Sequence, residues 1–187
     1  WEMVLVGAAC VLFCFLYTTL LAQHGMGDVL VLLFFGLVPV CLTYYVTMPP
    51  ASQTITAQVV WASLACGLVI DTLLVVNNYR DYDQDRAVGK KTLIVRIGRE
   101  RAEQLYGWLG NIATYMMWGC LVLGDSSFVL MLVCFACFVP YALLHGATRV
   151  QMRRIGRGRE LNKVLGMTAR NMFVFGVTTA IVTLFIL

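Results

Sequence analysis

The stretch AQVVWASLACGLVIDTLLVVNNYRDYDQD (residues 57–85) decides the fold class, because an almost uninterrupted apolar run leads directly into amides and acids. A helix of about 20 apolar residues is long enough to cross the hydrocarbon core of a bilayer. The whole chain is 60% hydrophobic and only 13% charged, whereas soluble domains are about 25% charged. We therefore expect a membrane-spanning helix that ends in a polar segment.

Similar apolar runs recur along the 187 residues of the chain. We read six spans, at residues 3–22, 29–48, 57–76, 105–123, 127–145 and 171–187. These runs predict an all-α, polytopic transmembrane helix bundle, with residues 1–187 forming a single domain. Because Trp1 stands almost at the start of an apolar run, we also expect this domain to be N-terminally incomplete.

The positive charge is confined to two segments. All 14 Lys and Arg residues lie in residues 80–101 or 149–170, and the connections at residues 49–56 and 124–126 contain none. By the positive-inside rule this asymmetry predicts a multi-pass protein of the cell membrane. Its loops 79–104 and 146–170 are expected in the cytoplasm, where basic residues meet anionic lipid. The lipid bilayer is thus an expected partner, and nucleic acid is not.

One acid, Asp71, lies inside the third expected span. An acid at such depth costs about 2.5–3.5 kcal/mol on insertion scales, so it usually faces a cavity or a polar partner. Two interpretations stay open: Asp71 lines a substrate cavity, or it is a buried acid that is hydrogen-bonded or protonated.

Three oxygen-bearing side chains follow at a regular spacing. Asn77, Asp81 and Asp85 are separated by four residues each, so on one helix they share a stripe, whereas Asp83 points about 200° away from Asp81. Mg²⁺ prefers oxygen ligands and keeps few carboxylates when phosphate supplies the others. The spacing predicts an Mg²⁺ site for a diphosphate, with Asp81 and Asp85 as the candidate catalytic and metal-binding residues.

Basic residues follow the acids closely. Gly89 permits a bend that would bring Lys90, Lys91 and Arg96 back towards the carboxylates, where they would suit phosphate oxygens. The alternative is an ordinary solvated helix end, in which Asp81 pairs with Arg80 and Asp85 pairs with Arg86.

The segment NNYRDYDQDRAVGKKTLIVRIG (residues 77–98) resembles the second aspartate-rich motif of the UbiA-type intramembrane prenyltransferases. Residues 25–45 and 161–170 resemble the same family, and the similarity is greatest to its 1,4-dihydroxy-2-naphthoate polyprenyltransferase branch in menaquinone synthesis. The resemblance implies a bundle of nine helices, of which the six spans here are helices four to nine. The first aspartate motif of the family has no counterpart in this chain.

The resemblance also implies an activity: transfer of a polyprenyl group from an allylic prenyl diphosphate to an aromatic acceptor, with release of diphosphate and loss of a ring carboxylate. It assigns Mg²⁺ to Asp81 and Asp85, with Asn77 supporting the metal shell and Lys91 and Arg96 contacting diphosphate. Arg80 matches the motif as well, without a defined role.

An allylic cation suits a dry cavity with aromatic faces. The candidate cavity residues are Tyr44, Tyr45, Asp71 and Tyr79. Other interpretations stay open: a different aromatic acceptor, a transporter-like bundle with the acids along an ion path, or a non-catalytic membrane scaffold.

Overall fold

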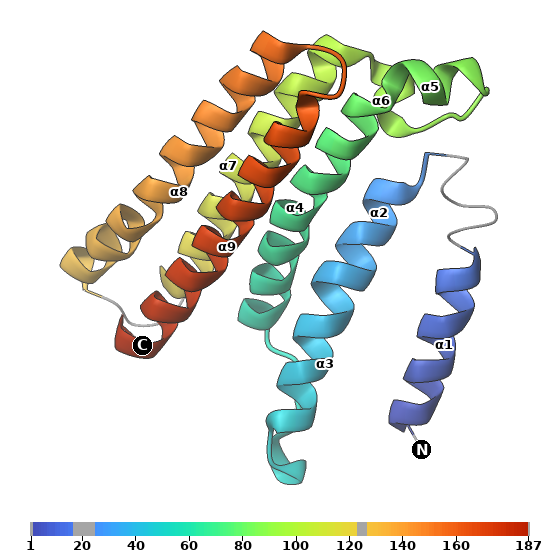
Figure 1. The fold of residues 1–187 in the computed structure, drawn as a ribbon. Helices are drawn as coiled ribbons and strands as arrows, with labels where there is room; N and C mark the ends of the chain where they lie inside the picture. The colour runs from blue at the N-terminus through green and yellow to red at the C-terminus, as the bar shows by residue number, and fades with distance from the viewer. Residues whose placement is uncertain (1, 17–24, 123–126, 187) are drawn as a thin grey trace.

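The computed structural model describes residues 2–16, 25–122 and 127–186, and every regular element in these ranges is a helix (Figure 1). The elements are α1 (Glu2–Leu16), α2 (Gly27–Val31), the π-helical η3 (Leu32–Leu37), α3 (Val38–Thr47), the short 3₁₀ helix η4 (Pro50–Ser52), α4 (Ala57–Arg80), α5 (Tyr82–Ala87), α6 (Leu93–Ile97), α7 (Arg99–Val122), α8 (Phe128–Ile155) and α9 (Leu161–Ile186). The described part of the chain therefore confirms the all-α prediction.

Four of these helical segments are long and apolar enough to cross a membrane: Gly27–Thr47, Ala57–Arg80, Phe128–Ile155 and Leu161–Leu184. They correspond to the second, third, fifth and sixth expected spans, so the chain is a polytopic membrane protein. Helix α7 covers most of the fourth expected span but is less apolar, since it carries Asn111 and several glycines. Helix α1 covers part of the first, and residues 17–22 of that span lie outside the described ranges. The total of six spans stays a prediction.

Helix α4 is the centre of the bundle, with the continuous segment α2–η3–α3 on one side and α7 and α9 on the other (Figure 1). Glycines allow the closest approach. A Cβ atom added to Gly36 of η3 would lie 2.7 Å from the Ser63 carbonyl oxygen and 2.8 Å from the Gly67 Cα atom. Small residues let membrane helices meet backbone to backbone in this way. The crossing fixes η3 on the face of α4 that borders the cavity described below.

The other side of the bundle is joined by polar side chains between α7, α8 and α9. The Tyr106 hydroxyl lies 3.1 Å from the Thr168 hydroxyl, and the Asn171 amide donates to the Thr148 hydroxyl at 2.8 Å. Nε2 of His145 lies 2.9 Å from the Tyr106 carbonyl oxygen. All five residues are buried. Such bonds hold helices together in lipid, where burial of apolar surface between helices contributes little.

The two basic segments lie at the same end of the bundle, as expected. Arg80 at the end of α4 donates from Nη1 to Oδ1 of Asn162 at 3.1 Å, and Arg99 donates from Nη1 to the Gly156 carbonyl at 2.7 Å. In Figure 1 the α8–α9 turn and the short helices α5 and α6 lie together at the upper end.

These segments are not the loops that were expected. Residues 146–155 extend α8, residues 161–170 begin α9, and only residues 156–160 connect them. Residues 79–104 likewise contain α5, α6 and the first turn of α7. The apolar pattern indicates where a helix leaves the membrane, but it does not indicate where the helix ends. Arginine has a high helix propensity, so an arginine-rich segment can continue the helix beyond the apolar run. Helix α8 ends at Gly156, whose φ of 67° is easily adopted only by glycine.

Candidate functional site

The acid motif lies on two helices and not on one, because the chain changes direction at Asp81. Helix α4 ends one residue earlier, Asp81 has φ −88° and ψ 4°, and α5 begins at Tyr82. In an uninterrupted helix the Tyr79 carbonyl would accept the N–H of Asp83. Here Nη1 of Arg99 donates to that carbonyl at 3.1 Å, and the guanidinium lies 4.8 Å from the ring centres of both Tyr79 and Tyr82. The single helix that was expected to carry all three oxygen-bearing residues is therefore interrupted at Asp81.

The spacing of the three oxygen ligands nevertheless survives. The N–H of Asp81 donates to the Asn77 carbonyl at 3.1 Å, and the N–H of Asp85 donates to the Asp81 carbonyl at 2.8 Å. These are the bonds between residues four apart that a helix makes. Asn77, Asp81 and Asp85 therefore remain on successive turns across the break.

Arg80 links two of the three candidate ligands. Its Nε and Nη2 donate to the two carboxylate oxygens of Asp81 at 2.7 and 2.9 Å, and Nη2 also donates to Oδ1 of Asn77 at 2.9 Å. The ion pair expected under the solvated-helix interpretation is thus present. The oxygens of Asn77 and Asp81 converge on a single positive group, which is the arrangement that a bound cation requires.

Asp85 is buried and pairs with Lys90, not with Arg86. Nζ of Lys90 lies 3.2 and 3.4 Å from the two carboxylate oxygens. The turn between them is made by Gly89, whose φ is 75°, and the N–H of Lys90 donates to the Asp85 carbonyl at 2.9 Å. The bend expected at Gly89 is confirmed.

The remaining charged residues of the motif are placed differently. Lys91 and Arg96 are exposed, and their segment lies against Gly25, because a Cβ atom on that glycine would be 2.5 Å from the Lys91 carbonyl and 3.4 Å from the Arg96 guanidinium.

Asp83 accepts a hydrogen bond from Nη2 of Arg99 at 3.0 Å, and its side chain is 60% exposed. The role of Arg99 was not predicted, since no local spacing connects it with α4.

The donor set fits Mg²⁺ without completing a metal site. The described residues contain no group of three or more His, Cys, Asp or Glu side chains that could hold a metal. Asp81, Asp85 and the Asn77 amide oxygen are the hard ligands that Mg²⁺ takes when phosphate oxygens fill its other positions.

A large apolar cavity of about 890 Å³ begins beside this motif. It lies among α1, α2, η3, α4 and α9 and is lined by Cys10, Leu30, Val31, Phe34, Phe35, Ile70, Leu73, Leu74, Asn77, Leu165, Gly166 and Ala169. Asn77 contributes the one amide in a lining that is otherwise apolar. This residue therefore belongs to the cavity and to the acid motif at once.

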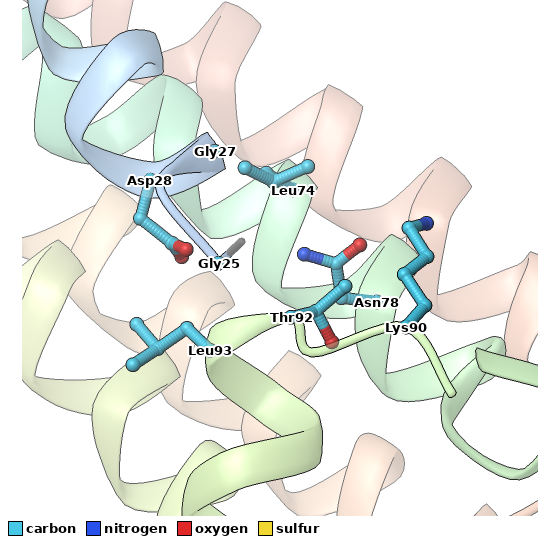
Figure 2. Close-up of a pocket in the computed structure, with 8 residues that line it drawn as sticks. All are labelled: Gly25, Gly27, Asp28, Leu74, Asn78, Lys90, Thr92 and Leu93. Atoms are coloured by element: carbon cyan, nitrogen blue, oxygen red, sulfur yellow. The ribbon is translucent and has the colours of Figure 1, made fainter. Parts of the chain in front are cut away.

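A smaller polar pocket of about 30 Å³ lies next to the cavity (Figure 2). Its lining comes from three segments and consists of Gly25, Gly27, Asp28, Leu74, Asn78, Lys90, Thr92 and Leu93. Leu74 also lines the apolar cavity, and Lys90 also holds Asp85. The pocket thus touches both other parts of the site. Asp28 was not predicted, because it looks like an ordinary acid in the first turn of a helix.

The candidate cavity residues from the sequence line neither of these spaces. Tyr44 and Tyr45 are half-buried near the end of α3, beside the start of α4, so the length of α4 (about 36 Å) separates them from the acid motif. Tyr79 is buried and donates its hydroxyl to Oε1 of Glu103 at 2.8 Å. Asp71 is buried on α4, and its Oδ1 has no hydrogen-bond partner in the described part of the chain.

Comparison with known proteins agrees with these features. Residues 1–167 match the UbiA prenyltransferase family. The chain is 34% identical over 187 aligned residues to a 1,4-dihydroxy-2-naphthoate octaprenyltransferase of Mycobacterium tuberculosis, covering 95% of this chain and 58% of the relative. The protein of the same name from Escherichia coli K12 is 33% identical over 119 residues, or 64% of this chain and 32% of the relative.

The chain thus spans little more than half the length of the mycobacterial relative and about a third of the Escherichia coli one. No solved structure matches it. The family match covers most of the chain and includes the acid motif, the polar pocket and every lining residue of the apolar cavity except Ala169. The chain therefore belongs to the UbiA prenyltransferase family.

Proposed function

We propose that this chain is part of a membrane enzyme that transfers a polyprenyl group from an allylic prenyl diphosphate to an aromatic acceptor. The acceptor is 1,4-dihydroxy-2-naphthoate, the substrate named for the relatives, and the pathway is menaquinone biosynthesis. The observation that carries the proposal is the position of Asn77, where an acid motif suited to diphosphate meets an apolar cavity of about 890 Å³.

The apolar cavity receives the prenyl chain. Ligand pockets of about 300–1,000 Å³ hold small organic molecules, and burial of their apolar surface drives binding at about 25 cal/mol per Å². Phe34 and Phe35 of η3 and Ile70, Leu73 and Leu74 of α4 line this space, and Asn77 beside the acid motif is the one polar side chain in the lining. An isoprenoid tail fits this chemistry, whereas a polar solute does not.

The acid motif receives the diphosphate. Asp81, Asp85 and Asn77 would hold Mg²⁺, which when bound would neutralise the phosphate oxygens and favour departure of the diphosphate. Arg80 and Lys90 neutralise the carboxylates in this structure and would add charge-assisted hydrogen bonds to phosphate. Lys91 and Arg96 would approach the same group from the exposed side.

The reaction forms one carbon–carbon bond and breaks two bonds. A ring carbon of the acceptor attacks C1 of the prenyl group while the bond from C1 to oxygen breaks, and the diphosphate leaves with that electron pair. The bond from the ring to its carboxylate then breaks, CO₂ leaves, and the released electron pair restores the aromatic ring. Residues such as Leu30, Leu73 and Leu165 exclude water from the carbon centre, which protects an allylic cation from hydrolysis.

The membrane placement follows from charge. The end of the bundle that carries the acid motif also carries the basic segments, so we assign it to the cytoplasmic face of the cell membrane. Residues 1–187 would form part of a single transmembrane domain, and the opposing aspartate motif of the family is not among them.

The test uses membranes that contain the complete polypeptide carrying these residues. Geranylgeranyl diphosphate and 1,4-dihydroxy-2-naphthoate are supplied, and diphosphate release and the prenylated product are measured with and without Mg²⁺. We expect Mg²⁺-dependent turnover that falls about 100-fold or more in Asp81→Ala and Asp85→Ala. Asp83→Ala, which removes an exposed acid of the same motif, should change turnover by less than about threefold.

Three outcomes would contradict parts of the proposal. Full turnover after removal of Mg²⁺ by a chelator would refute the metal assignment. Prenylation of 4-hydroxybenzoate in place of the naphthoate would refute the acceptor. Absence of diphosphate release with every hydroxyarene tested would refute the enzyme itself and favour a transporter-like or scaffold role.

A further inference from the structure

One oxygen of the Asp28 carboxylate, Oδ1, is buried without a hydrogen-bond donor. The residue is 8% exposed, and Oδ1 has no hydrogen-bond partner among the described residues. A buried oxygen in this state costs about 1–3 kcal/mol, more when it is charged. Figure 2 shows the carboxylate extending from the first turn of α2 on one side of the polar pocket, with Asn78 and Thr92 on the other.

None of the side chains that line this pocket bonds to Oδ1 of Asp28 in the described part of the chain. Lys90 lines the pocket, and its Nζ is held by Asp85. The hydroxyl oxygen of Thr92 accepts the N–H of Val95 at 3.3 Å and caps α6. Asp71, the nearby acid that interacts with Asp28, has an unpaired Oδ1 of its own and supplies no donor to it. Oδ1 of Asp28 is therefore left for a ligand that brings a donor.

The size of the pocket identifies the kind of group. A space of about 30 Å³ holds roughly one water-sized group, and it is too small for an aromatic ring. A hydroxyl group has the right size and brings the missing donor. Its ring would then lie against Leu74, the residue that the polar pocket shares with the apolar cavity.

We propose that this pocket binds a ring hydroxyl of the aromatic acceptor, with Oδ1 of Asp28 accepting the hydrogen bond. The proposal rests on the function proposed above and adds the subsite that recognises a hydroxyarene. It places the ring between the apolar cavity, which holds the prenyl chain, and the Lys90–Asp85 pair, which borders the diphosphate. The acceptor ring thereby faces the carbon at which the new bond forms.

The experiment measures how strongly the complete polypeptide prefers an acceptor with both ring hydroxyl groups over an acceptor that lacks one of them. Binding of 1,4-dihydroxy-2-naphthoate is compared with binding of 1-hydroxy-2-naphthoate and 4-hydroxy-2-naphthoate, by ligand fluorescence in detergent and by KM where turnover occurs. Wild-type protein should prefer the dihydroxy compound over one of its monohydroxy analogues by about 10- to 100-fold, the range for a hydrogen bond to a charged group. Asp28→Ala should remove this preference and leave the KM for prenyl diphosphate unchanged.

Two further variants keep the test decisive. Asp28→Asn preserves size and retains a weaker acceptor, so it should lose most of the preference even if the alanine variant does not fold. Glu100→Ala removes an exposed acid of the same end of the bundle that lines neither space, and it should keep the full preference. If both Asp28 variants discriminate like wild type, or weaken all three ligands equally, the pocket holds only water and the proposal is wrong.

The two proposals fail in different ways. If wild-type protein binds the naphthoates with the expected preference but transfers no prenyl group to them, the proposed function fails and the hydroxyl subsite stands. If wild-type protein prenylates the naphthoate and the Asp28 variants show unchanged preference, only the subsite fails.

Discussion

Replacing Gly36 by alanine should separate η3 from α4. The added Cβ atom would lie 2.7 Å from the Ser63 carbonyl oxygen and 2.8 Å from the Gly67 Cα atom. Both neighbours are backbone atoms of α4, so neither can turn aside as a flexible side chain would. Carbon atoms prefer separations of about 3.5–4.0 Å, so relief of the contact requires a displacement of roughly 1 Å.

The expected cost follows from that displacement. Overpacking of a well-packed interface typically destabilises by about 1–3 kcal/mol, and the rigid neighbours place Gly36→Ala in the upper part of that range. Gly67→Ala should cost less, because its Cβ atom would meet its nearest neighbours at 3.2 Å. Gly176→Ala is the control: its Cβ atom would have no neighbour within 4 Å, so the variant should gain up to about 1 kcal/mol from helix propensity alone.

The assay is unfolding by SDS titration in mixed micelles, followed by circular dichroism, with the free energy of unfolding compared across the three variants. The stability should rise in the order Gly36→Ala, Gly67→Ala, Gly176→Ala. Because η3 carries Phe34 and Phe35 of the apolar cavity, Gly36→Ala should also raise the KM for prenyl diphosphate. If Gly36→Ala were as stable as Gly176→Ala, the close crossing of η3 and α4 would be refuted.

Three shorter predictions concern the acid motif and its supports. Arg99→Lys should lower the free energy of unfolding by about 1–3 kcal/mol, because a lysine cannot bond two carbonyls and a carboxylate in one plane. The same SDS titration measures this loss, and an unchanged unfolding midpoint would contradict the prediction. Arg80→Met should raise the affinity for Mn²⁺, an Mg²⁺ substitute seen by electron paramagnetic resonance, by about 2- to 5-fold, since it removes a partly exposed cation from Asp81. The exposed Arg86→Met is its control, and equal gains in both variants would show a general charge effect. Thr92→Val should lower the free energy of unfolding by about 1 kcal/mol, because it removes the side-chain cap of α6. It should also speed proteolysis after Lys90 or Lys91, and an unchanged rate of cleavage would contradict the role of the cap.

Much of the scaffold was predictable because the bilayer limits what a chain can do. Apolar runs of about 20 residues must be helices in lipid, so the spans on α4, α8 and α9 follow from composition. Gly89 was recognisable as a bend because glycine adopts a positive φ without cost. The pairing of Arg80 with Asp81 was an open alternative, since adjacent opposite charges at a helix end can always meet.

The corrections arise from contacts between residues that are distant in sequence. The break at Asp81 depends on Arg99, which lies 20 positions after the Tyr79 carbonyl that it bonds. The polar pocket joins Asp28 to Asn78 and Thr92 from two other helices, and no periodicity in one segment reveals such a meeting. Tyr79 was selected for its aromatic ring, yet its hydroxyl is directed to Glu103, and only the packing of α4 on α7 determines that.

The bonds from Arg80 and Arg99 to the α8–α9 turn have a consequence for how family members diverge. Arg80 reaches a side-chain oxygen of Asn162, so substitutions at these two positions should covary among sequences of this branch. Arg99 instead bonds the main-chain oxygens of Tyr79 and Gly156, and a main-chain oxygen persists whichever residue supplies it. Position 99 should therefore remain arginine even where these two partners change, and covariation with its hydrogen-bond partners should be confined to Asp83, its side-chain acceptor.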